Sequence, residues 1–259
     1  MSDLAIETIG TGKQPLVLIH GWAMHGGIFA PLVRALSNDF SLHVVDLPGH
    51  GHSRDSALPL DPAAVCRALR GRIPPGALWV GWSMGGLFAL EATRDAMLAP
   101  RALSLLSSTP RFVQAPDWPQ GMPAAQFDAF EQALGTDYRA TVERFLALEV
   151  LGDIHAQTDL RALRHEIFAR GTPDPAKLRE GLGLLARTDL REALQAVVLP
   201  TLWVAGRRDR VVPPEAQRLA AASMPQARYL ELPRAAHAGF IGHPDAVAAA
   251  LRDLTDRKR

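Results

Sequence analysis

The pentapeptide Gly81-Trp82-Ser83-Met84-Gly85 carries the strongest chemical signal in the chain. An apolar run of strand length, residues 77–80, precedes it, and residues 86–92 read as a helix. A serine placed this way sits on a sharp, strained turn that exposes its hydroxyl and requires small flanking residues. The N-terminus of the following helix tolerates negative charge that develops there. The sequence therefore predicts that Ser83 is a nucleophile.

Asp209 and His237 each come just after a predicted strand, residues 201–206 and 228–232 respectively. A serine hydroxyl is a poor nucleophile at neutral pH and needs a base within hydrogen-bond reach. His237 can take the proton, and Asp209 can hold the imidazole tautomer and stabilise the imidazolium. The alternative roles are structural: Asp209 as a turn or as the cap of a helix starting near Pro214, and His237 as an ordinary strand-end histidine.

Three other histidines compete with His237 for the role of base: His20, His25 and His243. His20 belongs to the His20-Gly21-Trp22 turn that follows a predicted buried strand, and His243 precedes a proline. If Gly21 lets this turn fold back over the sheet, the amide of Trp22 can point at a bound oxygen. The alternative is an ordinary strand-to-loop turn. The amides of Trp22 and Met84 are the expected oxyanion hole.

The order of predicted elements indicates one α/β core with an insertion. Short apolar runs such as residues 16–19, 42–47 and 101–108 are typical of strands buried in a parallel sheet. From 111 to 189 no such run occurs, and helical periodicity replaces it. We expect a core of residues 1–110 and 190–259, mostly parallel sheet flanked by helices. We expect 111–189 to be a lid of about four helices; the alternative is a set of ordinary crossover helices.

Composition excludes several classes. The 259 residues are 47% hydrophobic with a formal net charge of +1, so no bulk field favours nucleic acid or a membrane surface. The acidic N-terminal stretch and the single cysteine, Cys66, favour a cytoplasmic protein with no internal disulfide. His50 and His52 have metal-ligand spacing but no evident third ligand, so we expect a loop role, no metal and no cofactor.

The chain order Ser83, Asp209, His237 is that of the α/β-hydrolases. Within that superfamily the chain resembles the pimeloyl-acyl-carrier-protein methyl ester esterases of biotin synthesis, the BioH family. The resemblance covers nearly the whole chain and includes the variable lid. The similar stretches are residues 18–22, 43–49, 79–87, 117–119, 141–148, 188–191 and 235–238.

The resemblance implies a serine carboxylesterase. Ser83 would attack the methyl ester of a pimeloyl chain carried on acyl carrier protein, methanol would leave, and water would hydrolyse the acyl-enzyme. The enzyme would act as a monomer that meets the carrier protein transiently. The family's substrate contacts would fall on Trp22, Ser83, Met84, Phe145, Leu146, Ala147, Leu148, Glu149 and His237.

The resemblance also implies that lid arginines hold the acidic carrier protein. Two family positions match here, Arg144 and Arg161, whereas two others fall on Ala140 and Gln157. Arg139 and Arg164 could compensate from adjacent positions. Residues 111–189 hold nine basic and twelve acidic side chains, a net of −3, so any such site must be a local patch.

Other activities stay open at this point. The same fold supports other carboxylesterases, lactonases, C–C bond hydrolases and cofactor-free haloperoxidases. Dehalogenation is disfavoured because the nucleophile position holds Ser83 and not an aspartate. A non-catalytic ligand receptor is the remaining class, and an intact triad argues against it.

Overall fold

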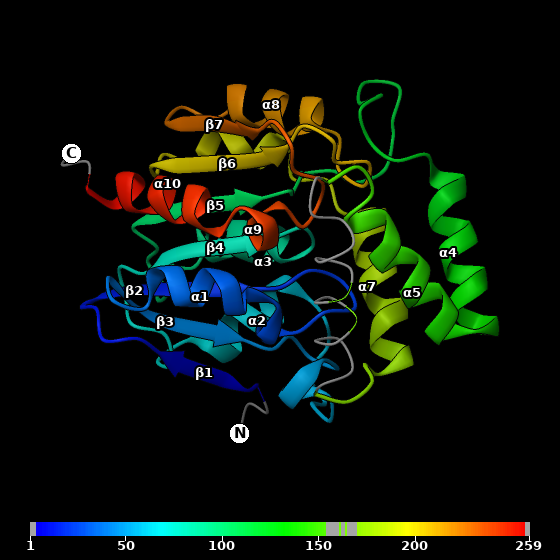
Figure 1. Cartoon of the computed structure of the whole chain (residues 1–259), viewed down its shortest axis with the longest axis horizontal. Helices are drawn as coiled ribbons and strands as arrows, with labels where there is room; N and C mark the ends of the chain where they lie inside the picture. Colours follow the sequence, from blue (N-terminus) through cyan, green and yellow to red (C-terminus); the bar gives the residue numbers. More distant parts are fainter. Residues whose placement is uncertain (1–3, 154–160, 162–163, 165–169, 257–259) are drawn as a thin grey trace.

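A seven-stranded sheet with the order β1-β3-β2-β4-β5-β6-β7 forms the centre of the molecule (Figure 1). The computed structural model describes residues 4–153, 161, 164 and 170–256. Only β1 runs antiparallel, against β3; the other neighbours are parallel. The strands are β1 (Ile6–Ile9), β2 (Gln14–Ile19), β3 (Phe40–Val45), β4 (Leu78–Trp82), β5 (Ala102–Leu106), β6 (Thr201–Gly206) and β7 (Ala227–Leu232).

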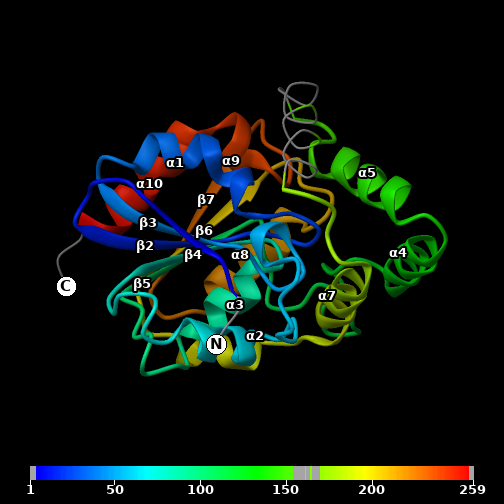
Figure 2. The same cartoon turned by 90° about the horizontal axis from the view of Figure 1, so that it is seen from below.

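Helices cover both faces of this sheet (Figure 2). Helices α1, α9 and α10 lie on one face, and α2 and α3 lie on the other. Helices α4, α5 and α7 lie beyond the carboxyl ends of the parallel strands (Figure 1). The helices are α1 (Ala30–Leu36), α2 (Pro62–Leu69), α3 (Gly85–Ala92), α4 (Ala124–Thr136), α5 (Tyr138–Glu149), α7 (Pro175–Arg187), α8 (Pro214–Ala222), α9 (Gly239–Gly242) and α10 (Pro244–Asp256), with 3-10 turns η1 (Gly26–Phe29), η2 (Gly51–Ser53) and η3 (Glu192–Ala196).

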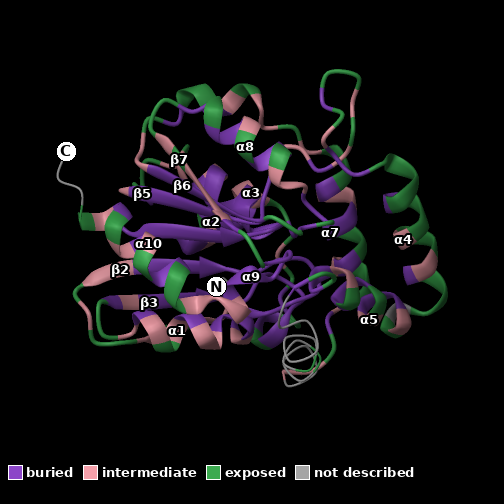
Figure 3. Ribbon diagram, turned by 45° about the horizontal axis from the view of Figure 1, so that its top comes forward, coloured by how far each residue is buried: buried purple, intermediate pink, exposed green. Residues whose placement is uncertain are grey.

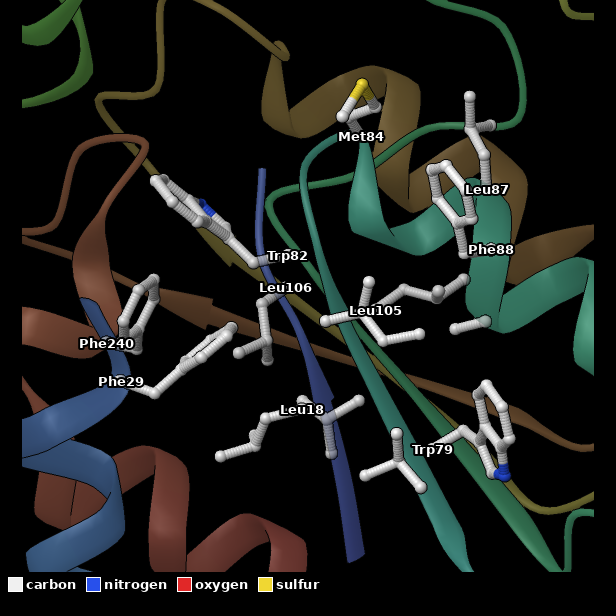
Figure 4. Packing of buried hydrophobic residues seen from close by; sticks show 14 of the residues in the cluster. Leu18, Phe29, Trp79, Trp82, Met84, Leu87, Phe88, Leu105, Leu106 and Phe240 are labelled. Carbon is white, nitrogen blue, oxygen red and sulfur yellow. The ribbon is translucent and has the colours of Figure 1, made fainter. Parts of the chain in front are cut away.

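The strands β4, β5 and β6 are fully buried (Figure 3). Because crossover helices pack on both faces of a parallel sheet, its strands read as continuous apolar runs. Figure 4 shows the aromatic packing beneath the site, where Trp82 meets Phe240 edge-on at 5.2 Å between ring centroids. Phe240 in turn lies 5.2 Å from the ring of Phe29. This rigid layer fixes the end of β4.

Most expected elements occur within a few residues of their predicted bounds. The strand expected over 42–47 instead ends at Val45, so Asp46 and Leu47 belong to the loop that follows β3. The sequence pattern of residues 62–72 predicts a helix, but α2 ends at Leu69, since Gly71 adopts a φ of 70° close behind it. The sequence pattern also predicts a helix over residues 160–169, and this segment lies almost wholly outside the described residues. In the described part of the chain, no helix has both the length and the apolar character that a membrane crossing requires.

Candidate active site

Ser83 occupies the turn between β4 and α3 with a φ of 53°, a left-handed conformation that non-glycine residues rarely adopt. Two hydrogen bonds hold this strained turn. The Ser83 amide donates to the Leu106 carbonyl at 2.9 Å, and the Ser108 hydroxyl donates to the Ser83 carbonyl at 2.7 Å. The strain expected from the pentapeptide is therefore present, and its support comes from the end of the neighbouring strand β5.

The glycines of the pentapeptide are required by close backbone contacts. A Cβ on Gly81 would lie 2.4 Å from the Gly85 carbonyl oxygen, and one on Gly85 would lie 2.2 Å from the Ile19 carbonyl oxygen. Any side chain at either position would force the turn apart. The prediction that this turn requires small residues is confirmed at Gly81 and Gly85, two positions from Ser83 on either side.

Asp209 and His237 meet at the carboxyl ends of β6 and β7. Asp209 Oδ2 lies 2.8 Å from Nδ1 of His237, and both side chains are fully buried. The second oxygen, Oδ1, accepts from the amides of Val211 and Val212 at 2.9 and 2.8 Å. These two amides hold the carboxylate so that Oδ2 faces the imidazole. His237 Nε2 has no hydrogen-bond partner among the described residues, so it is free to accept a proton.

The other candidate bases are engaged elsewhere. His20 Nε2 accepts from the Leu47 amide at 2.9 Å, so its proton is on Nδ1, which donates to the Gly21 carbonyl. Burial, and next the neighbouring His50, lowers the pKa of His20 to about 3, which keeps the ring neutral. His25 Nδ1 accepts from the Gly27 amide at the start of η1. His243 occupies the C-cap position of α9, where its backbone amide donates to the Gly239 carbonyl at 3.0 Å.

The turn after β2 lies directly against the nucleophile. A Cβ built on Gly21 would approach Ser83 Cβ to 3.2 Å, so the absence of a side chain brings the two turns together. In the described part of the chain, neither the Trp22 nor the Met84 amide donates to a loop or turn carbonyl. Both amides are available to an oxygen bound beside Ser83.

The Trp22 side chain joins this turn to the helices beyond the sheet. Its indole nitrogen donates to the Leu178 carbonyl on α7 at 2.9 Å, and its ring meets Phe145 on α5 edge-on at 5.0 Å. A Cβ on Gly181 would lie 2.7 Å from the indole, so α7 packs closely here. Trp22 thus fixes two of the three helices relative to Ser83.

An apolar cavity adjoins Ser83. Its walls leave only about 20 Å³ free, hardly more than one water molecule needs. An acyl chain therefore enters only if these side chains move apart. The lining residues are Trp22, Ser83, Phe112, Met122, Phe127, Phe130, Phe145, Leu182, Leu185 and Val211.

A larger open groove of about 690 Å³ lies between α4 and α5 and shares Met122 and Phe130 with that cavity. Its floor is apolar and includes Ala147 and Leu148. Arg144 and Arg210 are the charged residues in its lining. Arg210, on the loop after β6, was not identified from the sequence, because nothing in the local pattern shows that this loop reaches α5.

The segment expected to contact substrate, residues 145–149, divides between these spaces. Phe145 lines the small cavity, Ala147 and Leu148 line the groove, and Leu146 is fully buried. Glu149 is 1% exposed and its Oε2 has no hydrogen-bond partner among the described residues. Burial, and next the negative charge of Asp209, raises the pKa of Glu149 well above its usual range.

The arginines expected to bind a carrier protein are all exposed. Arg144 donates to the Thr141 hydroxyl and faces the groove. Arg139 pairs with Glu143 one turn along α5 at 3.7 Å. Arg161 and Arg164 are exposed, while Gln157 lies outside the described residues.

The remaining candidates take structural places. His50 is buried, its Nδ1 lies 2.9 Å from the Pro48 carbonyl, and burial lowers its pKa to about 4. His52 is exposed on η2. Cys66 is buried with its thiol 3.6 Å from the Phe88 carbonyl, and burial raises its pKa. In the described part of the chain, no three potential ligands gather around a metal position.

Comparison with solved structures identifies the fold. The esterase EaEST from Exiguobacterium antarcticum superposes with a TM-score of 0.87 at 22% identity, over 98% of this chain and 96% of its own. A bromoperoxidase from Bacillus anthracis gives 0.86 at 20% identity, over 98% and 95%. Because enzymes with these different names share the architecture, this likeness establishes the fold alone.

Curated relatives are much closer in sequence. A protein of Stenotrophomonas maltophilia named pimeloyl-[acyl-carrier protein] methyl ester esterase is 51% identical over 243 residues, 93% of each chain. A protein of the same name from Xanthomonas campestris pv. campestris is 50% identical over 246 residues, 95% of this chain and 96% of its own. The family model described as the alpha/beta hydrolase family matches residues 16–250. The chain therefore belongs to the alpha/beta hydrolase family, in the branch that contains these esterases.

Proposed function

We propose that this protein is a serine carboxylesterase that hydrolyses the methyl ester of pimeloyl-[acyl-carrier protein] to methanol and the free carboxylate, a step of biotin synthesis. The observation that carries the proposal is the identity of about half of all positions over 93–95% of the chain to proteins of that name. The matched region also spans the helices between β5 and β6, because it covers 93–95% of the chain. Those helices, within residues 111–189, act as the lid over a core formed by 1–110 and 190–259.

The proposed reaction assigns roles to three side chains. His237 Nε2 takes the Ser83 proton as Oγ attacks the ester carbonyl, and Asp209 stabilises the imidazolium through Nδ1. The amides of Trp22 and Met84 bind the oxyanion, each good donor being worth roughly 3–4 kcal/mol. His237 then returns the proton to the departing methoxy group, which leaves as methanol. A water molecule, deprotonated by the same imidazole, attacks the acyl-enzyme and releases the acid.

The apolar lining suits the methylene chain of the substrate. A pimeloyl methyl ester is uncharged at its reacting end, so it enters the cavity beside Ser83 without the cost of burying a carboxylate. The product carries that carboxylate, which favours its release. The carrier protein stays outside, and the exposed arginines Arg144, Arg161, Arg139 and Arg164 face it.

Hydrolysis of pimeloyl-[acyl-carrier protein] methyl ester, followed by mass spectrometry of the intact carrier protein, tests the proposal. We expect loss of one methyl group per carrier and a higher kcat/KM than for free dimethyl pimelate. The Ser83→Ala variant, which lacks the proposed nucleophile, is the negative control. Rapid hydrolysis of the free diester with no turnover of the carrier-bound one would instead assign the enzyme to small esters.

A further inference from the structure

The backbone of the loop that carries His237 is held by the lid. Three successive amides, those of Ala236, His237 and Ala238, are buried. The His237 amide donates to the Glu149 carbonyl at 2.9 Å, and the Ala238 amide donates to the same oxygen at 3.2 Å. The Ala236 amide donates to the carboxylate of Asp153 at 2.9 Å. Both acceptors lie at or just after the C-terminus of α5.

Asp153 is itself firmly placed. It lies in a turn that closes with its own amide on the Val150 carbonyl at 2.9 Å, and it is only 9% exposed. Gly152 adopts a φ of 92° in this turn, and its carbonyl accepts from Arg208 Nη1 at 2.7 Å. Arg208 directly precedes Asp209. The turn after α5 therefore contacts both the loop that carries Asp209 and the loop that carries His237.

On the opposite side, the same loop presses against the end of β6. A Cβ on Gly206 would lie 2.1 Å from the Ala236 carbonyl oxygen and 2.6 Å from that of Ala235. The loop is thus a single layer of backbone between the sheet and the turn after α5. Because a buried amide left without an acceptor is destabilising, removal of the Asp153 carboxylate favours a shift of this layer toward another acceptor.

We propose that Asp153 is a positioning residue for the base of the reaction: through the Ala236 amide it sets the backbone from which His237 reaches Ser83. Asp153 touches no reacting atom. The imidazole is held by Asp209 at one nitrogen only, so the direction of Nε2 depends on where the His237 backbone lies. A displacement of about 1 Å can cost roughly a hundredfold in rate. The inference rests on the proposed role of His237.

Two substitutions separate this role from general support of the fold. Asp153→Ala removes the acceptor, whereas Asp153→Asn keeps an oxygen that can accept from the Ala236 amide. With p-nitrophenyl acetate we expect Asp153→Ala to lower kcat ten- to a hundredfold with KM changed less than twofold. Asp153→Asn should restore kcat to within threefold of the wild type. The downfield NMR signal of the proton between His237 and Asp209 should shift in the alanine variant.

Asp137→Ala is the matched control. Asp137 also accepts from a backbone amide, that of Ala140, but at the N-terminus of α5 and on the exposed side. It should lower the melting temperature of the protein without lowering kcat. His237→Ala marks the floor of activity: if it keeps wild-type turnover, the proposed mechanism fails and not the positioning role alone.

If His237→Ala is inactive while Asp153→Ala keeps full kcat, the positioning role is overturned and the mechanism stands. Equal losses in Asp153→Ala and Asp137→Ala would also overturn it, because the effect would then come from the lid fold. Should Asp153→Ala not fold, Asp153→Glu displaces the carboxylate by one methylene and retains the charge. A folded Asp153→Glu variant with unchanged kcat and NMR signal would refute the proposal.

Discussion

The two oxygens of Asp209 serve different partners: Oδ2 lies 2.8 Å from His237 Nδ1, and Oδ1 accepts from the Val211 and Val212 amides. Both of these amides can only donate, so they keep an acceptor oxygen turned toward the loop. The atom that faces the imidazole is therefore fixed by the loop itself. If a nitrogen replaced Oδ2, a donor instead of an acceptor would face His237 Nδ1, and the imidazole would change its tautomer.

Asp209→Asn should lower kcat by about 10⁴-fold while the protein stays folded. The amide oxygen of the new side chain would keep the bonds from Val211 and Val212, so its NH2 group would face His237 Nδ1. Nδ1 would then have to accept, the proton would move to Nε2, and no lone pair would be left there for the Ser83 proton. Steady-state kinetics with a p-nitrophenyl ester, together with a thermal melt, checks this. A loss of less than tenfold would show that Asp209 does not set the tautomer.

Ser83→Ala should abolish ester hydrolysis, with a loss of about 10⁴-fold or more, because no oxygen nucleophile would remain at the turn. Alanine also fits the small space there, so the melting temperature should change little. Reaction with a fluorophosphonate probe, followed by mass spectrometry, should label the wild type once and leave the variant unlabelled. Labelling of Ser83→Ala at another serine would identify a different nucleophile.

Glu149 is predicted to make stability depend on pH. Its pKa is raised in the folded protein by burial and next by Asp209, so the folded state keeps a proton that the unfolded chain loses near its ordinary value of about 4.5. As the pH rises above that value, the unfolded state is favoured by about 1.4 kcal/mol per pH unit until Glu149 ionises in the fold. The bound proton stabilises the folded state fully only below that ordinary pKa, and this stabilisation is lost as the pH rises.

Glu149→Gln should remove this slope, because glutamine does not titrate. Urea unfolding between pH 5 and pH 8 measures it: the free energy of unfolding of the variant, relative to the wild type, should rise with pH. Glu143→Gln is the control on the same helix, where the side chain reaches solvent and pairs with Arg139. It should keep the wild-type slope. Parallel curves for Glu149→Gln and the wild type would mean that Glu149 keeps its ordinary titration.

The positions of Ser83 and Asp209 could be predicted because each follows a strand with a strong apolar signal, whereas the strand before His237 mixes apolar and charged residues and is only partly buried. The strand at 201–206 was expected with the bounds that β6 has. By contrast, β1 was not expected: it has four residues, lies at the sheet edge and is only partly buried, so it leaves almost no apolar pattern. Helix α1 was also missed, since Pro31 at its start reads equally well as a loop.

The helices α4, α5 and α7 show where sequence patterns stop being informative. Periodicity located α4, α5 and α7 and placed Glu149 on the same face as Val142, Phe145 and Leu146, but it could not show what its backbone contacts. In the structure its side chain is buried and its carbonyl accepts from the His237 loop. A hydrogen bond between two backbone groups this far apart in the chain does not depend on the type of either side chain. No sequence pattern therefore indicates it. Asp153 likewise carries no local motif, so its contact with the Ala236 amide could only be found in three dimensions.

Arg144 lines the groove between α4 and α5, and Arg161 is exposed in the same segment of the chain. No carboxylate pairs with Arg144 among the described residues, so its charge is available to a partner. Carrier proteins are acidic, and complementary charge mainly raises the rate of association. A small ester has no such surface, so it does not depend on this arginine. The two substrates therefore distinguish docking from catalysis.

Arg144→Glu combined with Arg161→Glu should lower kcat/KM for pimeloyl-[acyl-carrier protein] methyl ester by at least tenfold and change hydrolysis of a p-nitrophenyl ester less than twofold. The difference should shrink as salt rises from about 0.05 to 0.5 M, because screening weakens the attraction in the wild type as well. Arg34→Glu with Arg67→Glu changes net charge equally, on exposed residues of α1 and α2, and should leave both activities unchanged. Equal losses on both substrates would mean that the lid arginines support the pocket; no loss on either would place carrier docking elsewhere.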